Sequence, residues 1–173
     1  ERITREVDGS WTVERKNGER LRFGLSANAR VLRFTDDYEW LLSEREDAHG
    51  NVMTVTYDRT DAGNAYPLEI RYGLRRVGAT VQSLDGDSTR DRVVTFVLEP
   101  RPDAPVSYAA GFEQRLRKRL DRIDVRIGGV LVRRYDLIFD ESPDSFRSLL
   151  ARVALYGSDA DSASPTPPRV TSF

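Results

Sequence analysis

The stretch that decides the fold is residues 120–139, which read Leu120-Asp121-Arg122-Ile123-Asp124-Val125-Arg126-Ile127-Gly128-Gly129-Val130-Leu131-Val132-Arg133-Arg134-Tyr135-Asp136-Leu137-Ile138-Phe139. Apolar side chains recur at alternate positions on each side of the two glycines. A period of two is typical of a strand that turns one face to an apolar environment and the other to water. Gly128 and Gly129 tolerate the positive φ angles of a tight two-residue turn. The stretch therefore predicts a β-hairpin whose second strand carries Tyr135.

An earlier stretch predicts a second hairpin in the same way. Trp11 and Val13 alternate with polar residues before Lys16-Asn17-Gly18, and the alternation resumes after that turn signal. An Asn-Gly pair accepts the two positive φ angles of a type I′ turn, whose twist suits the strands on either side. We therefore expect a type I′ turn at Asn17 and Gly18.

Further β-prone segments continue along most of the chain. They cover residues 31–34, 38–44, 52–57, 66–72, 77–84, 92–99 and 149–156. Trp40 and Tyr72 lie on two of these segments. The loop at residues 47–51 contains Gly50 and Asn51, residue types that favour a turn. Many short strands separated by turn signals are typical of antiparallel structure.

The predicted fold is all-β, with antiparallel hairpins that form a sandwich or a curved multi-strand sheet and at most one or two short helical turns. We expect residues 77–84 and 92–99 to pair with each other across the charged loop 85–91. Helical spacing competes in two places, at Leu116, Leu120 and Ile123 and again at Phe146, Leu149, Leu150 and Val153. A short helix before Ile123 and one helical turn at residues 145–149 therefore stay open as alternatives.

Length and composition favour one domain. A chain of 173 residues is long enough to bury a hydrophobic core. We expect residues 1–157 to form a single antiparallel β domain and residues 158–173 to be a Pro/Ser-rich linker that leads to a following domain. Because the chain starts at Glu1 instead of Met, we interpret it as a fragment of a larger protein.

Charged residues are numerous but balanced. The chain has 27 Lys and Arg against 28 Asp and Glu, a net charge of -1. Proteins that bind nucleic acid or anionic membranes need a surplus of positive charge, so the balance argues against both partners. The basic stretch at residues 115–126 is interrupted by Asp121 and Asp124, and we interpret it as a solvated strand face or a set of intramolecular ion pairs. No apolar run approaches the roughly 20 residues that span a bilayer, so direct membrane insertion is not expected.

Little in the sequence points to catalysis or to a cofactor. The chain has no Cys and a single His, His49, which lies in a turn where a solvated side chain is the favoured interpretation. Glu44 and Glu46 have the Glu-x-Glu spacing that ADP-ribosyltransferases use, but no convincing Ser-x-Ser strand accompanies them, so chance is the favoured source. We therefore expect a protein without enzyme activity and without a cofactor.

One loop is a candidate for a cation site. Asp85, Asp87 and Asp91 space carboxylates along the loop as a hard cation such as Ca²⁺ prefers. The sixth position of this loop is Arg90 instead of Gly, and the twelfth is Phe96 instead of Glu. An ordinary charged hairpin loop is therefore the favoured interpretation.

Several turn and core motifs together resemble one family. They are Trp11-Thr12-Val13, Lys16-Asn17-Gly18, Trp40-Leu41-Leu42-Ser43, Gly50-Asn51, Leu68-Glu69-Ile70-Arg71-Tyr72, Val132-Arg133-Arg134-Tyr135 and Ser148-Leu149-Leu150. Their order resembles the SpvB / TcB family, the amino-terminal regions of bacterial toxin-complex B components and of related virulence proteins of the Rhs/YD-repeat kind. The resemblance implies a secreted or cell-surface, non-catalytic scaffold that contributes β-sheet to a shell around toxin cargo. Its implied partners are other domains of the same polypeptide, a propeller and an Rhs/YD shell, and other toxin-complex subunits.

The alternative is a β-sandwich that binds carbohydrate or protein at a cell surface. A sugar site needs aromatic rings that stand open on one face, whereas aromatic residues on strands more often pack in a core. The two tryptophans, Trp11 and Trp40, distinguish these interpretations, because protected indoles argue against a sugar site at those positions.

Overall fold

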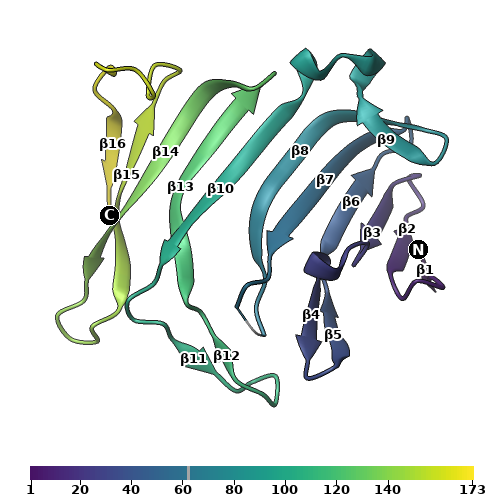
Figure 1. The fold of residues 1–173 in the computed structure, drawn as a ribbon, viewed down its shortest axis with the longest axis horizontal. Coiled ribbons are helices and arrows are strands. Elements are labelled where there is room, and N and C mark those ends of the chain that lie inside the picture. The colour runs from purple at the N-terminus through teal and green to yellow at the C-terminus, as the bar shows by residue number, and fades with distance from the viewer. Residues whose placement is uncertain (62) are drawn as a thin grey trace.

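The computed structural model describes residues 1–61 and 63–173, and these residues are almost entirely β-structure (Figure 1). Strands account for 57% of the structure and helical segments for 5%. The strands are β1 (Arg2–Arg5), β2 (Trp11–Glu14), β3 (Arg20–Phe23), β4 (Arg30–Arg33), β5 (Asp36–Trp40), β6 (Leu42–Glu46), β7 (Asn51–Asp58), β8 (Tyr66–Val77), β9 (Thr80–Ser83), β10 (Arg92–Pro100), β11 (Val106–Ser107), β12 (Gln114–Arg115), β13 (Lys118–Ile127), β14 (Val130–Glu141), β15 (Ser148–Tyr156) and β16 (Arg169–Ser172). The described helical segments are short 3-10 turns, η1 (Ala27–Ala29), η2 (Leu84–Gly86) and η3 (Ser88–Arg90).

Twelve of these strands form one antiparallel sheet. Its order is β1-β2-β3-β6-β7-β8-β10-β13-β14-β15-β16, with β9 paired to β8. Figure 1 shows the sheet as one curved layer, with β1 at one end and β16 at the other. The hairpins β4–β5 and β11–β12 form separate two-stranded sheets at its lower edge. The all-β prediction is therefore confirmed, and of the two predicted arrangements the curved sheet is the one that forms.

The register sorts the side chains onto two faces, because residues that face each other across neighbouring strands point to the same side. One side, which we call the apolar face, carries the pairs Trp11 with Phe23, Val13 with Leu21, Ile70 with Val94, Val94 with Val125, Phe96 with Ile123, Ile123 with Tyr135 and Leu137 with Val153. The other side, the charged face, carries the pairs Arg22 with Glu44, Thr95 with Asp124, Arg122 with Asp136 and Asp124 with Arg134. The alternation that defines the strands in the sequence thus becomes a difference between two surfaces.

The two faces differ in burial. In an ordinary β domain the apolar face is the more buried one, whereas here the most buried residues lie on the charged face. Every side chain just named on the apolar face is only half-buried. The most buried apolar residues of the long strands lie on the charged face, and they are Val52, Leu74, Leu131 and Ala154. Val52, Leu131 and Ala154 pair with charged residues, and Leu74 pairs with Val52. Long Arg side chains cover apolar neighbours with their stems while their charged heads stay accessible. The charged face is therefore covered from within the chain, and the apolar face is not.

The predicted glycine turns form, but one has another geometry. Gly128 and Gly129 have φ of 54° and 82°, as a type I′ turn requires. At the earlier turn Gly18 has φ 83°, whereas Asn17 is not among the described residues with positive φ. The Arg15 amide donates to the Glu19 carbonyl oxygen (2.8 Å), so the loop contains three residues. The type I′ prediction at Asn17 was wrong, because this loop uses a type I turn followed by a glycine bulge.

The predicted pairing of residues 77–84 with 92–99 was also wrong. β8 continues to Val77, and the chain turns at Gly78 so that β9 folds back onto β8 itself. β9 pairs with positions 74–77 of β8, and β10 pairs with positions 69–72 of the same edge. The two segments therefore lie one after the other along β8 instead of beside each other.

Other differences concern helical alternatives and segment ends. Leu120 and Ile123 lie in β13, and the segment 148–156 is β15, so neither helical stripe forms. Ladder pairing on both sides satisfies their backbone groups, which a short helix could not do as well. The segment 38–44 is divided between β5 and β6, which belong to different sheets. The polar segment predicted as a linker, residues 158–173, ends in β16, which pairs with β15.

Candidate interaction surface

The charged face has an ion-pair network that spans β3, β6 and β8. Arg22 Nη1 lies 3.4 Å from Glu44 Oε1 and 3.0 Å from Glu46 Oε2. Arg76 donates to the same two carboxylates, at 2.6 Å to Glu44 and 2.8 Å to Glu46. Burial alone would raise the pKa of Glu46, but the hydrogen bonds from Arg76 and Arg22 outweigh it and lower the pKa. The Glu-x-Glu pair is thus occupied by two arginines of this chain.

A second network lies on β13 and β14. Asp124, which is only 4% exposed, accepts hydrogen bonds from Arg134 Nε (2.7 Å) and Arg126 Nη2 (3.2 Å). Arg134 also reaches Asp161 at 2.8 Å, which ties the segment after β15 to the sheet. Hydrogen bonds with Asp124 raise the pKa of Arg134, while burial raises the pKa of the nearby Asp136. Both networks therefore join strands of the charged face to one another through ion pairs.

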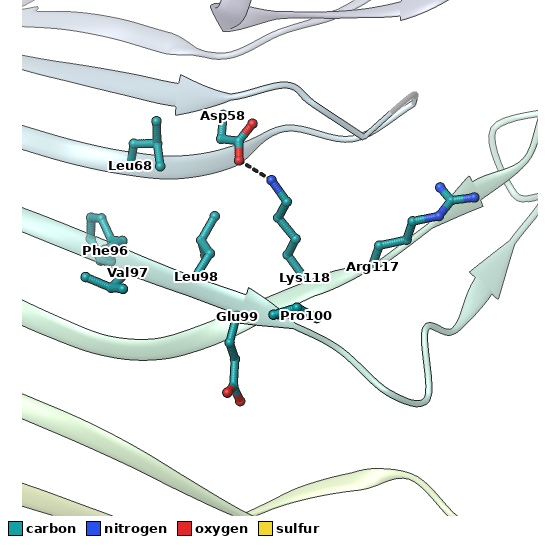
Figure 2. Close-up of a pocket in the computed structure, with 9 residues that line it drawn as sticks. All are labelled: Asp58, Leu68, Phe96, Val97, Leu98, Glu99, Pro100, Arg117 and Lys118. Atoms are coloured by element: carbon teal, nitrogen blue, oxygen red, sulfur yellow. Dashed lines mark hydrogen bonds and ion pairs between the residues drawn. The ribbon is translucent and has the colours of Figure 1, made fainter.

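A cavity of about 460 Å³ opens where the sheet divides between β8 and β10 (Figure 2). These two strands share only four paired positions, Glu69–Tyr72 with Arg92–Thr95. Beyond them the strands separate, and Leu68, Phe96 and Leu98 line the opening, as Figure 2 shows. We call this opening the seam. Its lining is mainly apolar, so the seam is an extension of the apolar face.

Polar contacts hold the two sides of the seam together. Lys118 of β13 bonds to Asp58 at the end of β7. The hydroxyl of Tyr66, a residue that is 8% exposed, donates to Asp61 (2.8 Å) and accepts from the amides of Arg117 (3.1 Å) and Lys118 (3.4 Å). Burial, together with the bond to Asp61, raises the pKa of Tyr66 to about 12. Tyr66 is therefore a neutral connector across the wide range of pH below that value.

The two small hairpins meet at the lower edge. The rings of Tyr38 on β5 and Phe112 in the β11–β12 hairpin lie 5.2 Å apart, edge to face. Phe34, at the tip of the β4–β5 hairpin, has φ 56° and is 81% exposed. Its neighbour Arg33 places the guanidinium 5.9 Å from the centre of the Phe34 ring. Exposed aromatic side chains therefore gather at this edge. The sequence contained no signal for them, because the turn at residues 34–35 lacks glycine.

The two tryptophans pack against each other. Their ring centres are 5.9 Å apart at an interplanar angle of 81°, and Trp40 Nε1 donates to the Gly9 carbonyl oxygen (2.9 Å). Both residues are half-buried. An indole that is engaged edge to face and hydrogen-bonded to the backbone does not offer an open ring for stacking on sugar. The structure therefore favours side-chain packing of Trp11 and Trp40 over an open platform for sugar.

In the candidate Ca²⁺ loop, Asp87 and Asp91 accept hydrogen bonds from different residues instead of converging on one point. Asp87 accepts from the amide (3.0 Å) and the hydroxyl (2.6 Å) of Thr89 and so caps η3. Asp91 accepts from the Ser83 hydroxyl at 3.0 Å. The side chain of Asp85 lies outside the described part of the chain. Within the described residues no cluster of three or more carboxylate, His or Cys side chains is placed to hold a metal ion.

The remaining residues singled out in the sequence lie in a turn or on the sheet. Gly50 has φ 80° in a closed turn, in which Asp47 accepts from the amides of His49 (2.8 Å) and Asn51 (2.9 Å). His49 is exposed. Tyr135 lies on the apolar face, as does Tyr72, the cross-strand partner of Arg92.

The basic stretch at residues 115–126 is largely paired within the chain, which confirms the ion-pair interpretation. Its pairs are Arg115 with Glu113, Lys118 with Asp58, Arg119 with Glu99, Arg122 with Asp121 and Asp124, and Arg126 with Asp124 and Asp161.

Among the described residues, the structure contains no helix with the length and apolar composition of a membrane span.

These observations define a class: an open, single-layer antiparallel sheet with one apolar and one charged face. The same fold occurs in solved structures of bacterial toxin proteins. The chain is similar to part of the TcdB2–TccC3 complex, with a TM-score of 0.69 and 21% identity over 92% of this chain. It is similar to part of the Tc holotoxin pore of Photorhabdus luminescens, with a TM-score of 0.70 and 21% identity over 95% of this chain.

The fold also matches the N-terminal domain of the effector protein SpvB from Salmonella typhimurium strain LT2, with a TM-score of 0.63 and 18% identity over 97% of this chain. The chain spans 10% of each of the toxin-complex chains and 63% of the SpvB domain chain. No protein-family model and no curated protein matches the sequence. The predicted resemblance to the SpvB / TcB family is thus confirmed for the fold.

Proposed function

We propose that this chain is a non-catalytic structural module of a large secreted bacterial toxin protein of the toxin-complex B and SpvB kind. In this role its sheet is one section of a wall that encloses toxin cargo. The observation that carries the proposal is the uncovered apolar face of a single-layer sheet. Its neighbours would be other parts of the same polypeptide, a propeller and an Rhs/YD shell, and other toxin-complex subunits.

An isolated globular domain buries the apolar side of its sheet against a second layer. Here the pairs around Val94 and Ile123 are half-buried, although they lie on central strands where a core would normally form. A contiguous exposed apolar surface marks a place where another protein surface binds. The half-buried state of β10 and β13 therefore favours a module that neighbours complete.

The edges of the sheet support the same proposal. β16 is exposed along its whole length, and β1 is exposed at three of its four residues. An open edge strand is a template for pairing with another strand. Both ends of the sheet are thus suited to continue into neighbouring β-structure, as a wall requires.

The chemistry of the charged face favours a non-catalytic role. Glu44 and Glu46, the one pair with a spacing known from catalysis, are held by arginines of this chain. The alternative of a sugar-binding sandwich has less support, because the sheet is a single layer and the two indoles contact each other.

A pair of substitutions tests whether the apolar face is uncovered. Val125 lies on that face, between Val94 and Arg133 in the register. If the face is uncovered, Val125→Lys keeps the isolated chain folded and lowers its binding of a hydrophobic dye and its self-association in light scattering. A core position would instead lose several kcal/mol, because a charge would be buried without a partner.

The matched control is Val93→Lys on the charged face, because Val93 is the sequence neighbour of Val94, the cross-strand partner of Val125. It leaves dye binding unchanged under the proposal. Equal dye binding by wild type and Val125→Lys, or unfolding of Val125→Lys, contradicts the proposed role.

A further inference from the structure

Two arginines, Arg92 of β10 and Arg133 of β14, lie on neighbouring cross-strand rows of the apolar face. Both are exposed. Every residue that the register places opposite them is uncharged. These partners are Tyr72 and Ile127 for Arg92, and Val125 for Arg133. Two positive charges therefore stand on a part of the sheet that is otherwise apolar.

Neither guanidinium has a polar partner in the described part of the chain, because no ion pair or hydrogen bond of either side chain occurs there. The guanidinium of Arg92 stays close to the sheet, since a Cβ added to Gly73 of β8 would lie 3.3 Å from its Nη1. By contrast, Arg126 of β13 and Arg134 of β14 both pair with Asp124 on the charged face. Among the described residues, the chain thus supplies a carboxylate to these two arginines of the charged face and none to the two on the apolar face.

A neighbour that covers the apolar face takes these two charges out of water. A guanidinium that loses water without gaining a partner is strongly destabilising. Backbone carbonyl oxygens accept its hydrogen bonds but leave the positive charge uncompensated, whereas a carboxylate does both and matches the planar fork of the guanidinium. The aliphatic stems of Arg92 and Arg133 stay packed against their apolar neighbours. A surface that covers this part of the sheet therefore needs carboxylates at two positions within an apolar contact.

We propose that the apolar face is covered by a polypeptide segment outside residues 1–173 that carries Asp or Glu side chains opposite Arg92 and Arg133. Apolar side chains of the same segment pack on Tyr72, Val125 and Ile127, beside the two ion pairs. This inference rests on the proposed function, in which neighbours cover the face, and adds the chemistry of the neighbour.

Cross-linking in the natural full-length polypeptide identifies the carboxylates. Arg92→Lys and Arg133→Lys keep the positive charge and introduce an amine, which a water-soluble carbodiimide joins directly to a carboxylate in contact with it. Mass spectrometry of the digested product then identifies the residue that was joined. We expect the amine at each position to be joined to an Asp or Glu outside residues 1–173. The absence of such a product at either position overturns the proposal.

A charge reversal tests whether the two ion pairs hold the cover in place. Ile70→Cys places a thiol in the row of Arg133, which runs through Val125 and Val94, and the rate of maleimide labelling at position 70 reports how well that row is covered. Adding Arg133→Glu opposes like charges across the contact, so labelling in the natural full-length polypeptide becomes about tenfold faster. Arg133→Lys keeps the charge and leaves the rate unchanged.

Arg152→Glu is the matched control. Arg152 is likewise exposed and has no ion pair within the described residues, but it lies two positions before Ala154 on β15 and so on the charged face. Its reversal leaves the labelling rate at position 70 unchanged, and the proposal is overturned if Arg133→Glu changes the rate no more than this control does.

The two levels of the account fail in different ways. A thiol at position 70 that reacts as fast in the folded full-length polypeptide as in its urea-unfolded form shows that the face is uncovered, and the proposed function then fails together with this inference. A protected thiol without the expected cross-link at positions 92 and 133 overturns this inference alone.

Discussion

Arg76 on β8 reaches across β7 to Glu46 on β6, with its Nε 2.8 Å from Oε2. Val52, the β7 partner of Glu46, pairs with Leu74 on its other side and is 3% exposed. The arginine therefore connects β8 to β6 across β7, on the face where Val52 and Leu74 are buried.

Removal of Arg76 tests the structural role of this network. Arg76→Ala leaves Glu44 and Glu46, which are largely buried, with Arg22 alone, so the free energy of unfolding falls by about 2 kcal/mol. Urea denaturation measures the loss. Arg76→Met keeps most of the aliphatic stem and so separates the contribution of the charge from that of the stem.

Arg71→Ala is the control for this experiment. Arg71 pairs with Glu69 at 3.2 Å, but its side chain is 44% exposed, so its removal costs less than about 0.5 kcal/mol. Equal losses in the free energy of unfolding for Arg76→Ala and Arg71→Ala would show that the network on the charged face stabilises the fold no more than an exposed ion pair does.

The glycine pair at the β13–β14 turn gives a second prediction. A Cβ on Gly128 would lie 2.7 Å from the Thr89 carbonyl oxygen, whereas a Cβ on Gly129 meets nothing within 4 Å. Both residues have positive φ, so Gly129→Ala costs about 1 kcal/mol and Gly128→Ala about 2 kcal/mol or more. Thermal unfolding of the two variants measures the difference. Identical melting temperatures would mean that the turn does not pack against Thr89.

Asp124 predicts how stability depends on pH. Burial alone would raise its pKa, but Arg134 and Arg126 outweigh burial and hold the pKa below the ordinary value of 3.8. The unfolded chain therefore binds this proton at a higher pH than the folded chain, and stability falls as the pH drops below 3.8. Asp124→Asn is less stable than wild type at pH 7 and loses less on acidification, as urea midpoints between pH 7 and pH 2 would show. A variant as steeply acid-sensitive as wild type contradicts this account.

Tyr66 predicts the behaviour of the seam. Tyr66→Phe removes the acceptor for the amides of Arg117 and Lys118, which costs about 1–2 kcal/mol because these donors lose a partner. Hydrogen exchange at these two amides becomes about tenfold faster, since the local opening is easier. Tyr72→Phe, on the apolar face, serves as the control and leaves both amides unchanged. Protection that survives in Tyr66→Phe would show that the hydroxyl does not connect the two sides.

The fold was largely predictable because it depends on local patterns. Alternation on both sides of Gly128-Gly129 specifies a hairpin, and in the structure Ile127 faces Val130 across that turn. The position of β9 was not predictable in the same way. Residues 74–77 and 69–72 of β8 offer the same edge, and only the tight turn at Gly78 decides that β9 takes the first set.

The surfaces were less predictable than the strands. The sequence shows which residues share a face but not whether a second layer covers that face. The alternation at Val94 and Ile123 is therefore equally consistent with a buried core and with an uncovered surface. The exposed Phe34 was missed for a different reason. Phe34 stands where a turn signal requires glycine, so the segment 31–34 resembles a strand that runs on through Phe34.

Cysteine labelling tests the central claim, that the apolar face is completed by other parts of a larger protein. Because the chain has no Cys, Ile70→Cys places a single thiol on the apolar face, opposite Val94. We predict that a maleimide labels this thiol quickly in the isolated folded chain and slowly in the natural full-length polypeptide, with the urea-unfolded samples equally reactive. Labelling that is as fast in the full-length polypeptide as in the isolated chain would contradict the account.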